Sequence, residues 1–276
     1  MIKDLIVNLS VAGSRDVAGP YGISIAEMFD AHAAAVAFSY EPVIPATIMG
    51  GIPASLIEQQ RTNNDKAARD AISKFEATAK REGISFESRI LSASVPGAAD
   101  MFGAMARRFD LSVVAQSEAD RLAPEEVIVE GALFASGRPV IVVPYIQKSG
   151  VKLDRVIVAW DASRNAARAV ADALPLLAKA KAIDVVIVAS ERPKSDELPG
   201  ADIGQHLARH GLKVEVKRIV ATDTNVADTL LSHAADTAAD FMVMGGYGHS
   251  RLREFVLGGA TRGILSSMTI PVLMSH

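Results

Sequence analysis

The stretch REGISFE at residues 81–87 returns as RHGLKVE at residues 209–215, with an arginine, a glycine and a glutamate at matching positions. Two further pairs of segments follow in the same order: 109–114 (FDLSVV) with 239–244 (ADFMVM), and 138–143 (RPVIVV) with 270–274 (IPVLM). The chain of 276 residues therefore contains an internal repeat. We expect two successive domains of one fold, residues 1–147 and 151–276.

Short apolar segments alternate with helical patterns in both halves. The expected strands lie at 3–9, 34–39, 84–91, 111–115 and 139–143, and again at 155–160, 183–189, 213–219, 240–244 and 271–274. Their nearly continuous apolar character is typical of parallel strands covered on both faces. The sequence predicts an α/β fold: two tandem doubly wound, parallel five-stranded sheets of Rossmann-like kind. We expect the last strands of the two halves to pair antiparallel, which would cover both sheet edges.

The composition excludes several classes of protein. The sequence has no cysteine, which excludes disulfide scaffolds, cysteine nucleophiles and thiolate zinc sites. The formal charge of −3, from 29 basic and 32 acidic residues, offers no electrostatic surface for nucleic acid. The first residues lack the long apolar core of a signal peptide, and no apolar run is long enough to span a membrane. We therefore expect a cytoplasmic protein.

The carboxyl-terminal half carries glycines directly after an expected strand, in VMGGYGHS at 243–250 and LGGATR at 257–262. The four that matter are Gly245, Gly248, Gly258 and Gly259. Backbone amides without Cβ atoms nearby, together with the free N–H groups of a helix start, suit phosphate oxygens. A tight turn with close helix–sheet packing would explain one such glycine, but four at these spacings favour phosphate binding. His249 could also reach a phosphate, although an exposed loop position explains it equally well.

Asp161 stands where the first strand of that half ends. Its carboxylate could accept hydrogen bonds from a ribose hydroxyl or a base amino group. It could equally form an Asx turn or cap the following helix, unless Ser163 takes the cap. The residues alone leave these roles open.

In combination, the strand ending in Asp161 and the pattern Met244-Gly245-x-x-Gly248-(nine residues)-Gly258-Gly259 resemble the universal stress protein family in its tandem two-domain form. The closing segment 270–274 resembles that family's last strand. The resemblance implies a fold of the adenine nucleotide alpha hydrolase kind. It also implies an adenine nucleotide, ATP or AMP, in the carboxyl-terminal half, with any Mg²⁺ carried by its phosphates.

The resemblance further implies a role for each matching residue. Asp161 would contact the adenosine, and the backbone at Ala189 would reach the base. Gly245 and Gly248 would line the ribose and phosphates, while Gly258 and Gly259 would donate amides to the phosphates. The family usually has a serine or threonine where Gly259 stands, so a hydroxyl contact would have to come from Thr261 or Ser250.

The amino-terminal half departs much further from the pattern. Ser10 stands where Asp161 stands in the other half, and the glycine turn is replaced by AQSEAD at 115–120, with Glu125 nearby. Carboxylates facing a triphosphate repel it. Glu130-Gly131 occupies the place where the phosphate-binding helix is expected to open. This half is therefore interpreted as a degenerate domain without a nucleotide site.

We expect a stress-response protein whose nucleotide acts as a regulatory switch, with slow hydrolysis at most because no catalytic base can be named. The two domains would pair within the chain, and an unknown protein would be the partner. A homodimer of the whole chain is compatible with the sequence, although no residue indicates one. One alternative is a scaffold, or a site for another ligand, in the amino-terminal half near the Pro- and Gly-rich segment 41–53. The other is an enzyme on a related nucleotide-binding fold, but the chain lacks the serine-rich loop of adenylating enzymes after its first strand.

Overall fold

A computed structural model describes residues 1–11, 15–41, 53–118, 124–189, 200–221, 225–247 and 259–276. The chain divides into two compact units, Met1–Arg138 (unit 1) and Pro139–His276 (unit 2). The strand at 140–143, placed in the first half from the sequence, falls in unit 2 because it pairs with that unit's last strand. No helix in the described part of the chain has both the length and the hydropathy that crossing a membrane requires.

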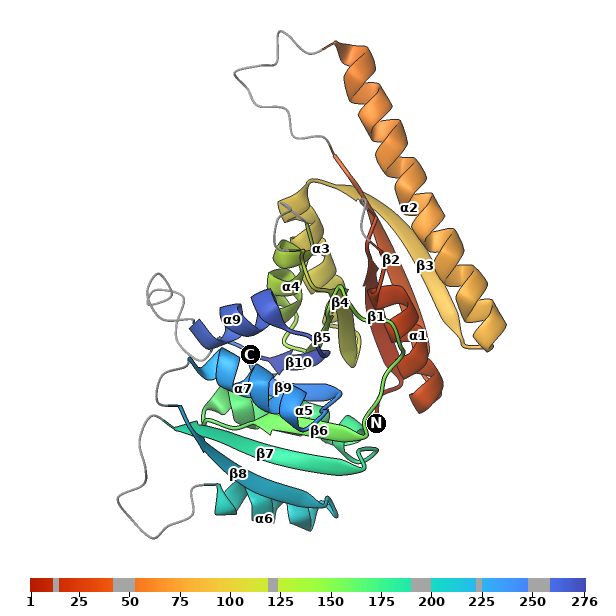
Figure 1. The fold of residues 1–276 in the computed structure, drawn as a ribbon. Coiled ribbons are helices and arrows are strands. Elements are labelled where there is room, and N and C mark those ends of the chain that lie inside the picture. The colour runs from red at the N-terminus through yellow and green to blue at the C-terminus, as the bar shows by residue number, and fades with distance from the viewer. Residues whose placement is uncertain (12–14, 42–52, 119–123, 190–199, 222–224, 248–258) are drawn as a thin grey trace. The chain divides into compact units, whose positions relative to one another are not determined.

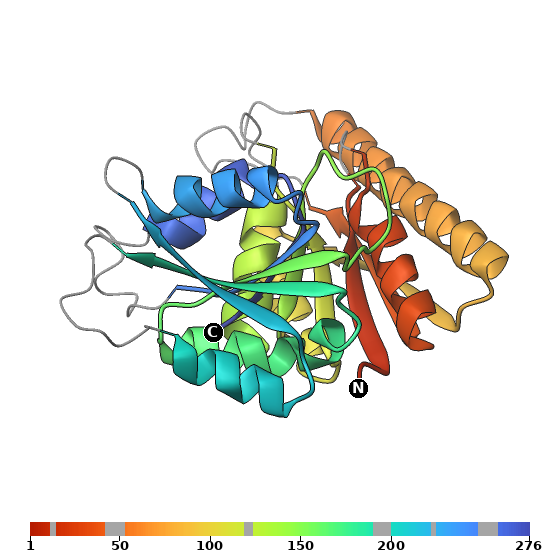
Figure 2. The same cartoon turned by 60° about the horizontal axis from the view of Figure 1, so that its bottom comes forward.

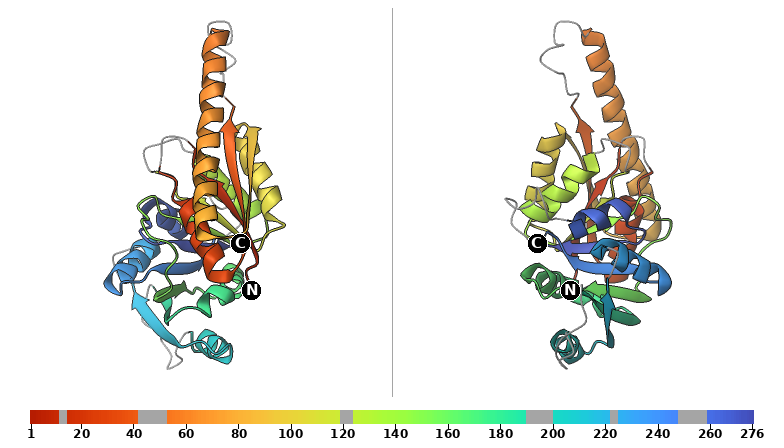
Figure 3. Two further views of the ribbon diagram at one scale, coloured as in Figure 1. Left: turned by 90° about the vertical axis from the view of Figure 1, so that its right-hand side faces the viewer. Right: turned by 60° about the vertical axis from the view of Figure 1, so that its left-hand side comes forward.

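Unit 1 is a parallel sheet with helices on both faces. Its elements are β1 (Asp4–Leu9), α1 (Ala18–Phe29), β2 (His32–Tyr40), α2 (Ala54–Glu82), β3 (Phe86–Ala93), α3 (Val95–Ala106), β4 (Leu111–Ala115) and α4 (Pro124–Ala135). The strand order is β3-β2-β1-β4, with every pair parallel. Helices α1 and α2 cover one face, and α3 and α4 cover the other (Figure 1). The first turns of α2 extend beyond the ends of β2 and β3 (Figure 3).

Unit 2 repeats this plan. Its elements are β5 (Val140–Val143), β6 (Arg155–Ala159), α5 (Arg164–Leu177), β7 (Ala182–Ala189), α6 (Ala201–Arg209), β8 (Val214–Val220), α7 (Val226–Asp236), β9 (Phe241–Gly245), α9 (Gly259–Ser267) and β10 (Val272–Ser275). Five parallel strands run in the order β10-β9-β6-β7-β8, and β5 joins the β10 edge antiparallel. The antiparallel pairing expected from the sequence is confirmed. Helices α5 and α6 lie on one face, α7 and α9 on the other (Figure 2).

The internal repeat is visible in matching contacts. The Asp110 carboxylate accepts hydrogen bonds from the backbone of Lys3 and Asp4 at 2.8 and 3.2 Å, where β1 begins. In unit 2, Asp240 accepts from Asp154 and Arg155 at 3.1 and 3.3 Å, where β6 begins. The repeated aspartate therefore ties the start of one strand to its neighbour in each unit.

The repeated glycines also share one backbone conformation. Gly83 follows α2 with φ of 69°, and Gly211 follows α6 with φ of 78°. This left-handed region is open to glycine at little cost, whereas a side chain would be strained there. Each glycine therefore ends a helix just before an edge strand of its unit.

A charged cluster lies beneath α7 in unit 2. Asp184, on β7, is only 1% exposed. Its carboxylate accepts hydrogen bonds from Arg155 Nη1 at 3.0 Å and Lys217 Nζ at 2.9 Å, and His233 Nε2 of α7 lies 3.9 Å away. Burial alone would raise the pKa of Asp184, but the hydrogen bonds from Lys217 and Arg155 outweigh it and hold the pKa below its ordinary value.

His233 is expected to make the stability of unit 2 depend on pH. Burial, followed by the charge of Lys217, lowers the pKa of His233 below its ordinary 6.5, against the attraction of Asp184 and Asp236. As the pH falls through about 6.5, His233 takes up a proton in the unfolded chain before it does so in the folded chain. The free energy of unfolding therefore falls as the pH drops from 7.5 to 5.5. The slope contributed by one such proton is at most about 1.4 kcal/mol per pH unit.

Urea unfolding of wild type and His233→Gln at several pH values measures this contribution. The variant should show a shallower loss of stability on acidification. His206→Gln, on the exposed side of α6, is the matched control and should keep the wild-type slope. If stability depended on pH equally in all three proteins, His233 would take up its proton as readily in the folded chain as in the unfolded one, and the prediction would be wrong.

Candidate functional site

The candidate site lies in unit 2 at the carboxyl ends of its central strands. The chain leaves β6 toward β7 on one side, while β9 lies on the other side of β6. This reversal is the switch point at which doubly wound sheets bind their ligands. The turn after β6, the end of β7, the turn after β9 and the start of α9 all belong to this end of the unit.

Gly245 ends β9 against the start of α5. A Cβ atom on Gly245 would lie 2.6 Å from the backbone N of Ala166 and 2.7 Å from the carbonyl carbon of Asn165. Such distances are too short for any side chain, so the glycine allows the strand and helix to pack closely. This is the packing role that was weighed against phosphate binding for a single glycine. A contact between Gly245 and a nucleotide stays a prediction.

The turn after β9 is joined to helix α9. The backbone N–H of Tyr247 donates to Thr261 Oγ1 at 3.1 Å across fourteen positions of sequence. Thr261 is 5% exposed. Tyr247 itself has φ of 46°, which places its backbone in the left-handed region. The two glycine-bearing segments that the sequence singled out therefore come together at their described ends.

Asn165, which sequence reasoning missed, holds the same turn from the other side. It lies in the first turn of α5 and is 3% exposed. Its Nδ2 donates to the carbonyl oxygens of Gly246 and Tyr247 at 2.6 and 3.1 Å, and lies 3.0 Å from Nδ1 of His276. The sequence offered one signal for this role: Asn165 is a polar residue on a helix face that is otherwise rich in alanine and leucine.

Asp161 adopts the Asx turn and leaves the helix cap to Ser163. Asp161 Oδ1 accepts from the Ser163 N–H at 2.9 Å, and Ser163 Oγ accepts from the Ala166 N–H at 3.1 Å. Asp161 is exposed at the carboxyl end of β6. Ala189 ends β7, and its carbonyl accepts from the Ala221 N–H at 3.0 Å.

Gly259 is the first described residue of α9, and its surroundings differ from those of Gly245. A Cβ atom on Gly259 would have no described atom within 4 Å. Gly248, His249 and Gly258 lie outside the described residues. In the described part of the chain, no three acidic, histidine or cysteine side chains are grouped as metal ligands would be.

The corresponding end of unit 1 is acidic. Helix α4 begins at Pro124 with Glu125 and Glu126 in its first turn, and Glu125 is 8% exposed. The prediction that a helix opens at Glu130-Gly131 is therefore wrong. Gly131 lies inside α4, where an added Cβ would be 2.5 Å from the carbonyl oxygen of Ala99 on α3. That glycine serves the close crossing of two helices.

Comparison with known proteins gives a family match for part of the chain. Residues 152–276 match the model of the universal stress protein family. Universal stress protein Slr1230 of Synechocystis sp. (strain ATCC 27184 / PCC 6803 / Kazusa) is 36% identical over 67 residues, which span 24% of this chain and 22% of that relative's length.

Two solved structures share the fold over the whole chain. A universal stress protein from Archaeoglobus fulgidus DSM 4304 superimposes with a TM-score of 0.68 at 15% identity, covering 99% of this chain and 95% of that one. A protein of unknown function from Pseudomonas aeruginosa PAO1 gives a TM-score of 0.62 at 13% identity, covering 99% and 92%. At these identities the likeness shows the fold alone, and both units share it. The carboxyl-terminal half of the chain, residues 152–276, belongs to the universal stress protein family.

Proposed function

We propose that unit 2 binds an adenine nucleotide, ATP or AMP, with its phosphates at the start of α9 and its adenosine between the ends of β6 and β7. The observation that carries this proposal is the Tyr247–Thr261 hydrogen bond, which brings the β9 turn against the start of α9. No described atom lies within 4 Å of a Cβ built on Gly259, so no described side chain crowds the first amide of that helix. Free N–H groups and the positive end of a helix dipole attract phosphate.

The contacts of Thr261 and Asp161 indicate different roles for these two residues near the proposed site. The buried Thr261 oxygen already accepts from Tyr247, which favours a role in positioning the turn over direct contact with a phosphate. Asp161 uses Oδ1 for its own turn, so Oδ2 is the oxygen to accept from a ribose hydroxyl. Gly248, His249 and Gly258 are proposed phosphate neighbours on sequence grounds.

The proposed role is binding and regulation. Rapid phosphoryl transfer needs an oriented water and stabilised charge on the transferring group, so slow hydrolysis is the most that we expect. Mg²⁺ would arrive with the phosphates. A nucleotide that contacts several segments at once can shift their conformations and so act as a switch for a protein partner. The tandem form, with unit 1 as the degenerate copy, is part of the same proposal.

Calorimetric titration of ATP and AMP into the full chain tests the adenosine contact. Asp161→Asn keeps an oxygen for the Ser163 N–H but replaces the second acceptor by an amide, so affinity should fall about tenfold while stability is unchanged. Asp161→Ala should lose the same affinity and some stability. Wild-type affinity in Asp161→Asn would show that the residue serves the turn alone.

A further inference from the structure

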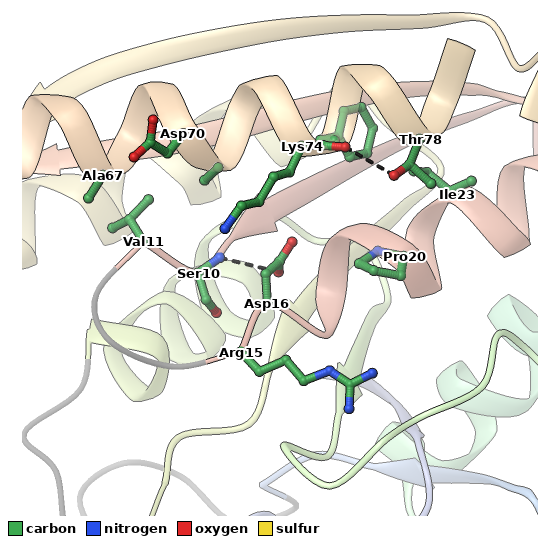
Figure 4. Close-up of a pocket in the computed structure, with 12 residues that line it drawn as sticks. Ser10, Val11, Arg15, Asp16, Pro20, Ile23, Ala67, Asp70, Lys74 and Thr78 are labelled. Carbon is green, nitrogen blue, oxygen red and sulfur yellow. Dashed lines mark hydrogen bonds between the residues drawn. The ribbon is translucent and has the colours of Figure 1, made fainter. Parts of the chain in front are cut away.

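Unit 1 contains a pocket of about 440 Å³ beside the end of β1 (Figure 4). Its walls come from the β1–α1 connection, α1 and α2. The apolar part of the lining consists of Val11, Pro20, Ile23, Ala67, Ala71 and Phe75. This volume lies within the range of sites for small organic molecules, about 300–1,000 Å³. The apolar lining calls for a ligand with a hydrophobic body.

The two carboxylates at the pocket already have partners. Asp16 Oδ1 accepts from the backbone N–H groups of Ser10 and Gly19 at 3.3 and 3.2 Å. Asp70 pairs with Lys66 one turn earlier on α2, with 3.2 Å between Oδ2 and Nζ. Neither carboxylate therefore needs a cation from a ligand.

Among the described residues, the cations at the pocket have no such partners. Lys74 leaves α2 and extends across the pocket toward Ser10 and Asp16 (Figure 4). Neither Lys74 nor Arg15 forms an ion pair with any residue in the described ranges. The pocket thus joins an apolar wall to an ammonium group that forms no ion pair with a described residue.

We propose that this pocket binds a small organic acid with an apolar body, its carboxylate at the Lys74 ammonium and its hydrocarbon chain along Ile23 and Phe75. The ion pair would orient the molecule, and burial of the chain would supply most of the binding energy. A polyphosphate is a poorer ligand than a monocarboxylate, because the Asp16 carboxylate toward which Lys74 extends repels each negative charge and a single carboxylate meets the least repulsion. This site is separate from the nucleotide site proposed for unit 2.

Titration of the full chain with octanoate, followed by NMR, tests this site, with 1-octanol as the uncharged probe. Octanoate should bind, and Lys74→Gln should weaken it about threefold while leaving 1-octanol unchanged, as expected for a partly exposed ion pair. Lys80→Gln, on the same helix and paired with Glu76, is the matched control and should bind like wild type. Ala71→Phe fills the pocket and should abolish binding of both probes.

Several results would overturn the proposal. These are absence of octanoate binding to the wild type, equal affinity in wild type and Lys74→Gln, an equal loss in Lys80→Gln, or full binding by a folded Ala71→Phe. Lys74 is exposed, so its variant should fold and keep the test decisive if Ala71→Phe does not. Titration of Lys74→Gln with ATP should match wild type, which separates this site from the nucleotide site.

Discussion

Asp184→Ala is expected to lower the free energy of unfolding of the chain by about 3 kcal/mol. The variant removes the 1%-exposed carboxylate that accepts hydrogen bonds from Arg155 and Lys217. It leaves the Lys217 ammonium and the Arg155 guanidinium facing a buried gap beside His233. This loss of stability is at the low end for a broken buried pair. The side chains of Arg155 and Lys217 are 36% and 30% exposed, so they can turn partly to water.

Urea unfolding at pH 7 measures this loss, and Asp154→Ala is the matched control. Asp154 also pairs with a lysine, Lys181, at 2.6 Å, but both members of this pair lie at the surface. Exposed pairs are screened by water, so the control should change stability little. Similar losses in the two variants would contradict the argument from burial.

Acid should remove the Asp184 contribution as well. The pKa of Asp184 is lowered in the folded chain, so the carboxylate stabilises fully above the unfolded value of 3.8, and its contribution disappears as the pH falls toward the folded pKa. The difference in unfolding free energy between wild type and Asp184→Ala should therefore shrink below pH 4. A constant difference would show that the ionised carboxylate is not what stabilises the fold.

Gly245→Ala and Gly259→Ala are expected to differ sharply, although both glycines belong to one sequence pattern. A Cβ at position 245 would overlap the backbone at Asn165 and Ala166, which should lower the free energy of unfolding by about 1–3 kcal/mol. A Cβ at position 259 would meet no described atom within 4 Å at a helix start, so stability should hold or rise by about 0.5 kcal/mol. ATP affinity should stay close to that of wild type, because the family that the sequence resembles usually carries a Cβ-bearing serine or threonine at this position and the amide N–H is retained.

Thermal unfolding and ATP titration of the two variants separate these roles. A stable Gly259→Ala that still binds ATP fits a contact through the backbone amide, and an unstable Gly245→Ala assigns Gly245 to packing. A large loss of ATP affinity in a folded Gly259→Ala would contradict a contact made through the backbone amide alone. Wild-type stability in Gly245→Ala would contradict the close contact with α5.

The sequence predicted the fold because its signals are local and repeated. The apolar strands, the glycine that ends α2 and α6, and the aspartates at 110 and 240 each reflect a contact made within a few residues or between adjacent strands. Because of the repeat, the strands predicted in one half were also evidence for the strands predicted in the other half. The expected strand boundaries differ from the observed ones by two residues at most, and the largest differences are at β2 and the edge strand β3, which follows the register of β2.

The site was less accessible to sequence reasoning because its key contacts join distant segments. Asn165 lies 81 residues from the carbonyl of Gly246 that it holds. Asp184 sits within an apolar strand, and only the neighbouring β6 and β8 supply its two cations. The start of α4 was misplaced because Gly131 was interpreted as a counterpart of the phosphate-binding glycines, although it serves the crossing with α3.

NMR of the full chain labelled with ¹⁵N-glycine tests the central claim most directly, because the amide of Gly259 reports on the start of α9. Addition of ATP should shift the Gly259 signal strongly and leave unchanged that of Gly83, at the carboxyl end of α2 in unit 1. A Gly259 signal that stays in place at saturating ATP, or shifts confined to glycines of unit 1, would contradict a nucleotide site in unit 2.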